Sequence, residues 1–167
     1  MTSATKSNAS RYGYVLWDEV VEDVHALHRD VTVERVLVDA LAARMVSNPA
    51  SLDVVVASNL FGDILTDLAA VLQGGMGIAA SASLGAEGVA MFEPVHGSAP
   101  DIAGRGIANP LGAIWSASLM LDHLGEPAAA KRLMDAIEAV CRDGVLTRDL
   151  GGTASTVEVG DAVAGRL

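Results

Sequence analysis

Hydrophobic positions along the first half of this chain follow two periods, one typical of helices and the other typical of strands. Apolar side chains three and four residues apart indicate amphipathic helices, while alternating or short continuous apolar runs indicate strands. In chain order the pattern predicts a helix, a strand, a helix, a strand and a helix at about residues 12–28, 31–38, 40–46, 54–57 and 60–72. Such an alternation is typical of an α/β layered fold with a largely parallel sheet.

The second half begins with a different texture. Glycine and serine recur between residues 74 and 85, which predicts loops, and residues 89–92 could form a short strand. The segment from Glu93 to Pro110 is too rich in glycine and proline for regular structure and too long for a plain connector, so a functional loop is favoured. Helices are then predicted at about residues 110–124 and 127–142, followed by a glycine loop and a short terminal helix.

Composition excludes several classes of function. The formal net charge is −10 and the 11 basic residues are scattered, which argues against nucleic acid and against anionic membrane surfaces. No apolar run reaches the roughly 20 residues that a membrane span needs. The single cysteine, Cys141, cannot form an internal disulfide, which favours a reducing cytoplasm, and its place in a helical apolar pattern predicts a core position.

Two carboxylates interrupt the apolar pattern of the 60–72 helix. Asp63 and Asp67 are four residues apart, so they lie on one helical face with Cβ atoms about 5–6 Å apart. Like charges at this spacing weaken an isolated helix, but two hard oxygen ligands would suit Mg²⁺ or Mn²⁺. A solvated acidic face is the alternative that the helix alone leaves open.

Several separate motifs together carry a resemblance to a known family. They are TSATKSN at 2–8, VDALAARMV at 38–46, DVVVASNLFGDILTDLA at 53–69, FEPVHGSAPDIAGRGIANP at 92–110 and DLGGTAST at 149–156. In this order they resemble the metal-dependent β-decarboxylating dehydrogenases, which include isocitrate, 3-isopropylmalate, tartrate and D-malate dehydrogenases. The resemblance implies an isopropylmalate-dehydrogenase-like layered α/β fold.

The resemblance also implies roles for individual residues. Asp63 and Asp67 match ligands of a divalent cation, Mg²⁺ or Mn²⁺, and Asp39 matches a third ligand that the other subunit of a homodimer contributes. Lys6 matches the catalytic lysine, which also reaches across the dimer interface. The expected NAD-binding residues come from one long loop and the strand before it: Glu93, His96, Gly97, Ser98, Ala99, Pro100, Asp101, Ile107 and Asn109.

The implied reaction is the NAD-dependent oxidative decarboxylation of a 2-hydroxy dicarboxylic acid. Asp101 favours NAD over NADP, because a carboxylate accepts hydrogen bonds from a ribose diol and repels a 2′-phosphate. The runs ATKSN at 4–8 and WDE at 17–19 look more like the tartrate and D-malate branch than the 3-isopropylmalate branch, which stays the alternative substrate class.

The resemblance covers only the C-terminal half of the family fold, so the N-terminal half is expected to be missing. Residues 1–88 match the second half of the metal and dimerisation domain, and residues 89–167 match the C-terminal part of the NAD-binding domain. The arginines that grip the substrate carboxylates belong to the other half. Three hypotheses follow: part of a dehydrogenase whose other half is on a second chain or was lost from the gene model, a non-catalytic NAD-binding or regulatory subunit, or a truncated remnant.

Overall fold

The first strand of the chain consists of small residues that are all buried. In the computed structural model, which describes residues 1–86 and 88–167, β1 (Thr2–Thr5) lies between β2 (Glu34–Leu37) and β3 (Val55–Val56) in a three-stranded sheet. Both pairings are parallel, with Thr2 opposite Glu34 on one side and Val55 on the other. The predicted parallel sheet is therefore present.

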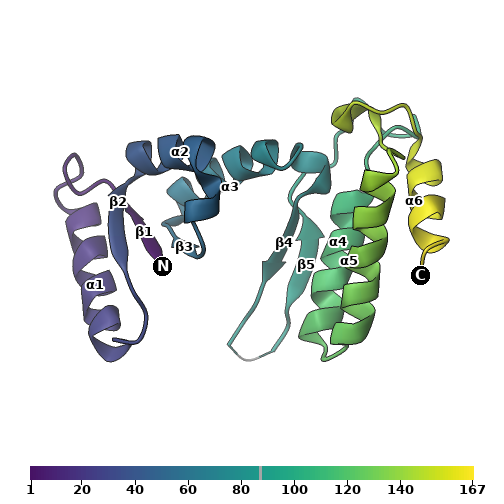
Figure 1. Cartoon of the computed structure of the whole chain (residues 1–167). Helices are drawn as coiled ribbons and strands as arrows, with labels where there is room; N and C mark the ends of the chain where they lie inside the picture. The colour runs from purple at the N-terminus through teal and green to yellow at the C-terminus, as the bar shows by residue number, and fades with distance from the viewer. Residues whose placement is uncertain (87) are drawn as a thin grey trace. The chain divides into compact units, whose positions relative to one another are not determined.

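Helices cover both faces of this sheet. They are α1 (Gly13–Leu27), α2 (Val38–Ser47) and α3 (Asn59–Leu72). Neighbouring side chains of a strand point to opposite faces. Ser3 accepts a hydrogen bond from Trp17 of α1 (3.0 Å), whereas Ala4 packs in a core cluster with Leu41 of α2 and Leu65 of α3. Consequently α1 lies on one face, and α2 and α3 lie on the other (Figure 1).

The chain divides into two compact units, residues Met1–Leu72 and Gln73–Leu167, here called unit 1 and unit 2. Unit 1 is the sheet with its three helices and a short 3₁₀ turn at Pro49–Ser51. The boundary between the two compact units therefore lies after Leu72 in the sequence. The functional boundary expected at residue 88 concerns the family domains and stays a prediction.

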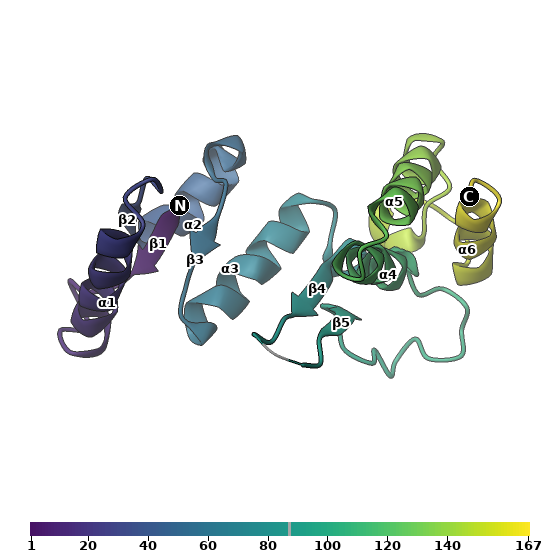
Figure 2. The same ribbon diagram turned by 90° about the horizontal axis from the view of Figure 1, so that it is seen from below.

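Unit 2 begins with a hairpin and continues into helices. A 3₁₀ turn at Met76–Ile78 precedes the antiparallel strands β4 (Ala80–Ser83) and β5 (Met91–Pro94), on which α4 (Leu111–His123) packs. Next come α5 (Pro127–Arg142), a 3₁₀ turn at Arg148–Leu150 and α6 (Thr156–Ala164). Both views show α4 and α5 side by side (Figure 1; Figure 2).

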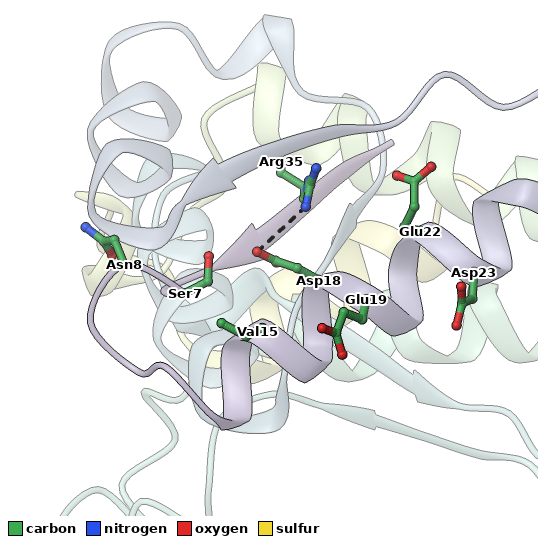
Figure 3. A pocket seen from close by; sticks show the side chains of 8 residues that line it. All are labelled: Ser7, Asn8, Val15, Asp18, Glu19, Glu22, Asp23 and Arg35. Carbon is green, nitrogen blue, oxygen red and sulfur yellow. Dashed lines mark ion pairs between the residues drawn. The ribbon is translucent and has the colours of Figure 1, made fainter.

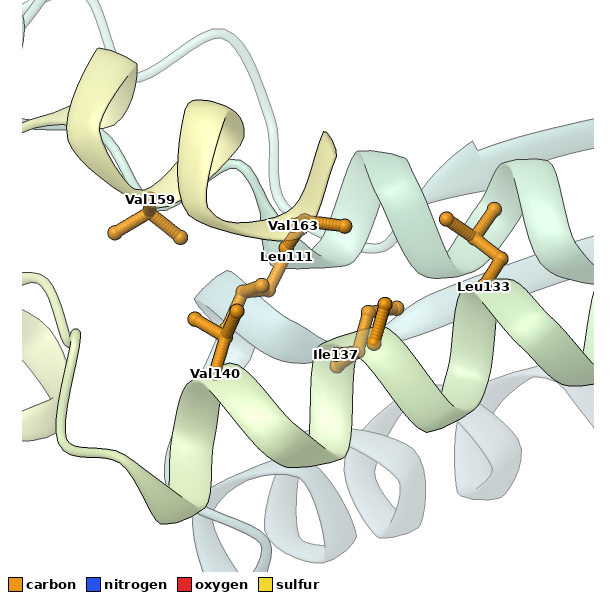
Figure 4. Close-up of a cluster of buried hydrophobic side chains, with 7 residues drawn as sticks. Leu111, Leu133, Ile137, Val140, Val159 and Val163 are labelled. Atoms are coloured by element: carbon orange, nitrogen blue, oxygen red, sulfur yellow. The ribbon is translucent and has the colours of Figure 1, made fainter. Parts of the chain in front are cut away.

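The core of unit 2 is formed where α4, α5 and α6 meet (Figure 4). Its buried members come from all three helices: Leu111, Leu133, Ala136, Ile137, Val140, Val159 and Val163. Cys141 packs at the edge of this cluster, and partial burial raises the pKa of its thiol, which suits a packing role better than a nucleophilic one.

Most predicted elements are present with shifted ends. The strand predicted at 31–38 begins at Glu34, and the helix predicted from Pro110 begins at Leu111. The strand β4 lies in a segment predicted as loop, because Ala80–Ser83 has no large apolar residue to give a strand pattern. Among the described residues, no helix combines the length and apolarity that crossing a bilayer requires.

Candidate functional site

An ion pair joins the ends of two neighbouring parallel strands in unit 1. Thr5 of β1 lies opposite Leu37 of β2, so the residues that follow these strands emerge at the same edge of the sheet. Lys6 directly follows β1, and Asp39 lies in the first turn of α2. The Lys6 ammonium group donates a hydrogen bond to the Asp39 carboxylate. This bond, helped by the backbone N–H groups of the helix start, holds the pKa of Asp39 below its ordinary value.

The predicted metal-binding carboxylates, Asp63 and Asp67, lie on the exposed side of α3. Both are exposed, whereas Leu65 and Ala70 face the interior. Within the described part of the chain, no lysine or arginine pairs with either carboxylate. Two unneutralised carboxylates one helical turn apart are hard oxygen donors of the kind that Mg²⁺ and Mn²⁺ accept.

These carboxylates do not form a complete metal site by themselves. Residues 1–86 and 88–167 contain no group of three or more His, Cys, Asp or Glu side chains placed to hold a metal ion. Asp39 is engaged by Lys6 and is not grouped with Asp63 and Asp67. The donor chemistry therefore fits a divalent cation that takes a further protein ligand from outside this chain, and the expected role of Asp39 from a second subunit stays a prediction.

A strongly acidic cavity lies in unit 1 (Figure 3). It has a volume of about 570 Å³, and its lining comes from the turn after β1, from α1 and from β2: Ser7, Asn8, Val15, Asp18, Glu19, Glu22, Asp23 and Arg35. Arg35 approaches one oxygen of Asp18 at 3.9 Å, while the other oxygen is buried without a hydrogen-bond partner among the described residues. The cavity therefore carries excess negative charge.

Unit 2 holds a second cavity, of about 760 Å³, beneath the long irregular loop that follows β5. This volume is within the range usual for small-molecule and cofactor sites. The loop runs from His96 to Asn109 and is called the 96–109 loop below. Six of the predicted cofactor-binding residues line the cavity: His96, Gly97, Ser98, Ala99, Ile107 and Asn109. The structure thus brings most of the predicted nucleotide set together around one space.

Three predicted residues of this set are not part of the cavity lining. Pro100 and Asp101 lie in the exposed turn of the same loop, directly after Ala99. Glu93 lies in β5, opposite Ser81 of β4. Their roles in cofactor binding stay predictions.

Backbone strain marks the same loop. Ala99 has a positive φ of 42°, a conformation that is common for glycine and that L-residues other than asparagine and aspartate seldom adopt. Strain of this kind persists where the surrounding structure enforces it, and it clusters at ligand sites. At this residue the strain coincides with the cavity wall.

Ten further residues line the cavity that sequence reasoning did not select. Five of them lie outside the 96–109 loop: Gly77, Arg148, Asp149, Thr156 and Val157. Four of these five belong to or adjoin the DLGGTAST motif, which carried the resemblance without an assigned role. The motif itself was the available signal. Nothing in the spacing of this motif shows that it borders the 96–109 loop, which lies about forty residues earlier in the sequence.

The architecture is that of a dehydrogenase of the isocitrate dehydrogenase type. The crystal structure of isocitrate dehydrogenase from Methylococcus capsulatus is 42% identical and has a TM-score of 0.94, with 99% of this chain and 49% of that chain covered. The sequence profile described as isocitrate/isopropylmalate dehydrogenase matches residues 1–163. The chain therefore belongs to the isocitrate/isopropylmalate dehydrogenase family.

Relatives with two different names are similar to this chain along its whole length. A Bacillus subtilis (strain 168) protein named "Probable tartrate dehydrogenase/decarboxylase" is 51% identical over 100% of this chain and 48% of its own length. The 3-isopropylmalate dehydrogenase of Anaeromyxobacter dehalogenans (strain 2CP-C) is 47% identical over 100% of this chain and 47% of its own length. The chain thus spans about half the length of the curated relatives it matches.

Proposed function

We propose that this chain supplies the metal-binding and NAD-binding parts of an enzyme that oxidatively decarboxylates a 2-hydroxy dicarboxylic acid of the tartrate or D-malate type. The observation that carries the proposal is the cavity of about 760 Å³ in unit 2, because residues of one predicted nucleotide loop surround it. Family membership supports the same reaction class, since the family consists of dehydrogenases.

The cofactor in this proposal is NAD, held at its adenosine end by the 96–109 loop. The carboxylate of Asp101 in the exposed turn of this loop would repel a 2′-phosphate and accept hydrogen bonds from a ribose diol. Bound NAD supplies the hydride acceptor for the oxidation. The protein contributes the shape of the loop and the charge at its turn.

The cation in this proposal is Mg²⁺ or Mn²⁺, held by Asp63 and Asp67 together with Asp39 of a second copy of the chain. The unpaired state of the first two carboxylates supports it, because their mutual repulsion is relieved when a cation binds. A bound divalent cation acts as a Lewis acid toward the substrate oxygens.

Lys6 is the proposed proton-transfer group. Its ammonium group is partly exposed, with 29% of the side chain accessible, and its bond to Asp39 fixes its position. Since both residues are proposed to act across a dimer interface, the pair would present lysine and carboxylate together to the neighbouring subunit. A homodimer that shares its active sites is therefore part of the proposal.

Turnover requires groups from the other half of the family fold, on this polypeptide or on another chain. We further propose a reducing compartment, the cytoplasm, because the chain contains a single cysteine. The relative named 3-isopropylmalate dehydrogenase, at 47% identity, supports 3-isopropylmalate as the second candidate substrate.

The deciding experiment measures NAD reduction with Mn²⁺ and each of tartrate, D-malate and 3-isopropylmalate. The chain is assayed alone and together with the N-terminal half of the Bacillus subtilis relative. We expect turnover in the supplemented assay, fastest with tartrate or D-malate, and loss of turnover in the Lys6→Met variant. Asp53→Asn, an exposed change in unit 1 away from these residues, should keep the activity.

Two outcomes would contradict the proposal in different ways. NAD binding without turnover of any substrate in either assay would favour a non-catalytic NAD-binding subunit. A kcat/KM that is highest for 3-isopropylmalate would keep the reaction class and replace the substrate.

A further inference from the structure

The segment from Thr147 to Thr156 contains the DLGGTAST motif and has no role in the proposed chemistry. It is nevertheless tied to the last residues of the 96–109 loop, although some forty residues separate the two segments in sequence. Its contacts fall into two groups, one at each end of the segment. Both groups lie within unit 2.

At the first end, Asp149 fixes the side chain of Asn109. The Asp149 carboxylate accepts hydrogen bonds from Asn109 Nδ2 (2.9 Å) and from Thr147 Oγ1 (2.5 Å). The amide oxygen of Asn109 accepts a hydrogen bond from the backbone N–H of Leu111 (2.9 Å). Because one side of the amide donates and the other accepts, the buried Asn109 amide has a single satisfied orientation.

At the second end, Thr156 holds the backbone of the same loop. Its N–H donates to the carbonyl of Gly106 (2.9 Å), and its hydroxyl donates to the carbonyl of Ala108 (2.5 Å). Thr156 is the first residue of α6, and a capping box between Ser155 and Glu158 fixes that helix start. Two carbonyl groups of the loop are thus anchored to a helix that belongs to the core of unit 2.

Two glycines leave the space that these contacts need. A Cβ atom on Gly152 would lie 2.0 Å from the carbonyl oxygen of Leu146, so only glycine lets the segment turn back this closely. A Cβ atom on Gly77 would lie 2.5 Å from Asp149 Oδ2 and 3.0 Å from Asn109 Cβ. The backbone at Gly77 therefore packs directly against the Asn109–Asp149 pair, and a larger residue at this position would displace it.

We propose that the 147–156 segment is a clamp that holds residues 106–109 in the shape that accepts the adenosine part of the dinucleotide, with Asp149 and Thr156 as positioning residues. This inference rests on the proposed NAD-binding function. The clamp acts through the loop, because Asp149 orients Asn109 and Thr156 orients the carbonyls of Gly106 and Ala108. Pre-organisation of this kind raises affinity by removing the cost of ordering the loop on binding.

The test compares disruptive and conservative variants at both ends of the clamp. Asp149→Leu removes the acceptor for Asn109, and Thr156→Val removes the hydroxyl that reaches Ala108. Asp149→Asn and Thr156→Ser keep a group able to make the same contacts. Calorimetry at low temperature measures binding of AMP and of NAD to each full-length chain, and circular dichroism verifies that each variant is folded. Asp135→Asn, an exposed change on α5, is the matched control.

We expect each disruptive variant to bind AMP and NAD about tenfold more weakly, because each loses a hydrogen bond to the 96–109 loop and leaves the loop group unsatisfied. The conservative variants and the control should stay within about threefold of wild type. The inference is overturned if folded Asp149→Leu and Thr156→Val bind AMP as tightly as wild type and differ only in thermal stability. If the wild-type chain binds neither AMP nor NAD, the proposed cofactor function is itself wrong and the clamp falls with it.

Discussion

The two units of this chain differ in how completely they bury their apolar side chains. In unit 2 three helices share one core, and Leu111, Val140 and Val159 are almost fully buried. In unit 1 the buried apolar cluster is smaller and consists of Ala4, Leu41, Met45 and Leu65, with Ala70 buried outside it. The helix α1 contains no buried residue, although its apolar spacing is clear.

The helix α1 leaves much of its apolar surface exposed. A largely apolar cavity of about 390 Å³ lies between this helix and the sheet, and four α1 side chains beside it or on the same helix are more than half exposed: Leu16, Val20, Val24 and Leu27. The 96–109 loop, with its proposed role in NAD binding, is thus attached to a well-packed helical core. The charged residues with proposed catalytic roles are mounted on a unit with less packing of its own.

The sharpest test of this difference is truncation of the unit 2 core. Leu111→Ala should lower the free energy of unfolding of unit 2 by about 3 kcal/mol, because Leu111 is 1% exposed and touches the centre of the helical cluster. The free energy of unfolding of unit 2 is measured by urea unfolding with Trp115 fluorescence as the signal, in a Trp17→Phe background. Leu124→Ala, at a 66% exposed position, should change it by less than about 0.5 kcal/mol. A loss below about 1 kcal/mol for Leu111→Ala would refute the packing argument.

The equivalent truncation in unit 1 asks whether the units unfold separately. Leu41→Ala should cost about 2.5 kcal/mol, since Leu41 is fully buried but has fewer buried neighbours. In a Trp115→Phe background, Trp17 fluorescence should report this loss. In the Trp17→Phe background, Leu41→Ala should leave the unfolding transition that Trp115 fluorescence reports unchanged. If both tryptophans report the same shift, the two units unfold as one cooperative body.

The carboxylates of α3 provide a test that depends on charge rather than packing. Asp67→Asn should weaken Mn²⁺ binding about 30-fold, close to 2 kcal/mol, because it removes one anionic ligand of a proposed pair. Calorimetric titration of the chain with Mn²⁺ measures this change. Asp53→Asn, also exposed in unit 1, should leave the affinity unchanged. Equal effects of the two substitutions would mean that the cation responds to general negative charge.

The smallest expected effect concerns the Lys6–Asp39 pair and its dependence on pH. The Lys6 hydrogen bond lowers the folded-state pKa of Asp39 below its ordinary value of 3.8. The pair therefore stabilises the folded state above that ordinary pKa, and the contribution is lost as the pH falls through the folded-state pKa. Wild type should have a slightly higher melting temperature than Asp39→Asn at pH 7, and the difference should vanish in strong acid.

A double-mutant cycle isolates this pair from other effects of substitution. Lys6→Met should remove the same contribution, and the double variant should lose nothing further. Since the Asp39 side chain is 65% exposed, solvent screens the interaction, and the change in melting temperature is small. A difference that persists unchanged to low pH would show that ionisation of Asp39 is not its source.

Periodicity predicted the helices well because their apolar faces are local in sequence. The helix α3 occupies Asn59–Leu72 and places Leu65 inside and Asp63 outside, but three other members of its apolar set are more than half exposed: Leu60, Ile64 and Val71. The strand β4 could not be predicted in this way. Its four residues are alanine and serine, and their strand conformation depends on pairing with β5 across the hairpin.

The candidate site was predictable only to the extent that it is local. The 96–109 loop lies within one continuous motif, so the residues of that motif could be named before its shape was known. The bond between Asn109 and Asp149 joins residues 40 positions apart, and no period in the chain encodes that distance. The proposed metal site presents a similar limit, because its third carboxylate is expected to come from another copy of the chain.

The arrangement of β1 has a consequence for the order of folding. Every ladder partner of β1 lies far along the chain, Thr2 pairing with Glu34 and with Val55, whereas α4 and α5 are neighbours joined by a turn of three residues. Closing long loops before any contact is gained slows folding, whereas a helical hairpin closes quickly. Although unit 1 leaves the ribosome first, we therefore expect the later helices to reach their native arrangement sooner once synthesis is complete.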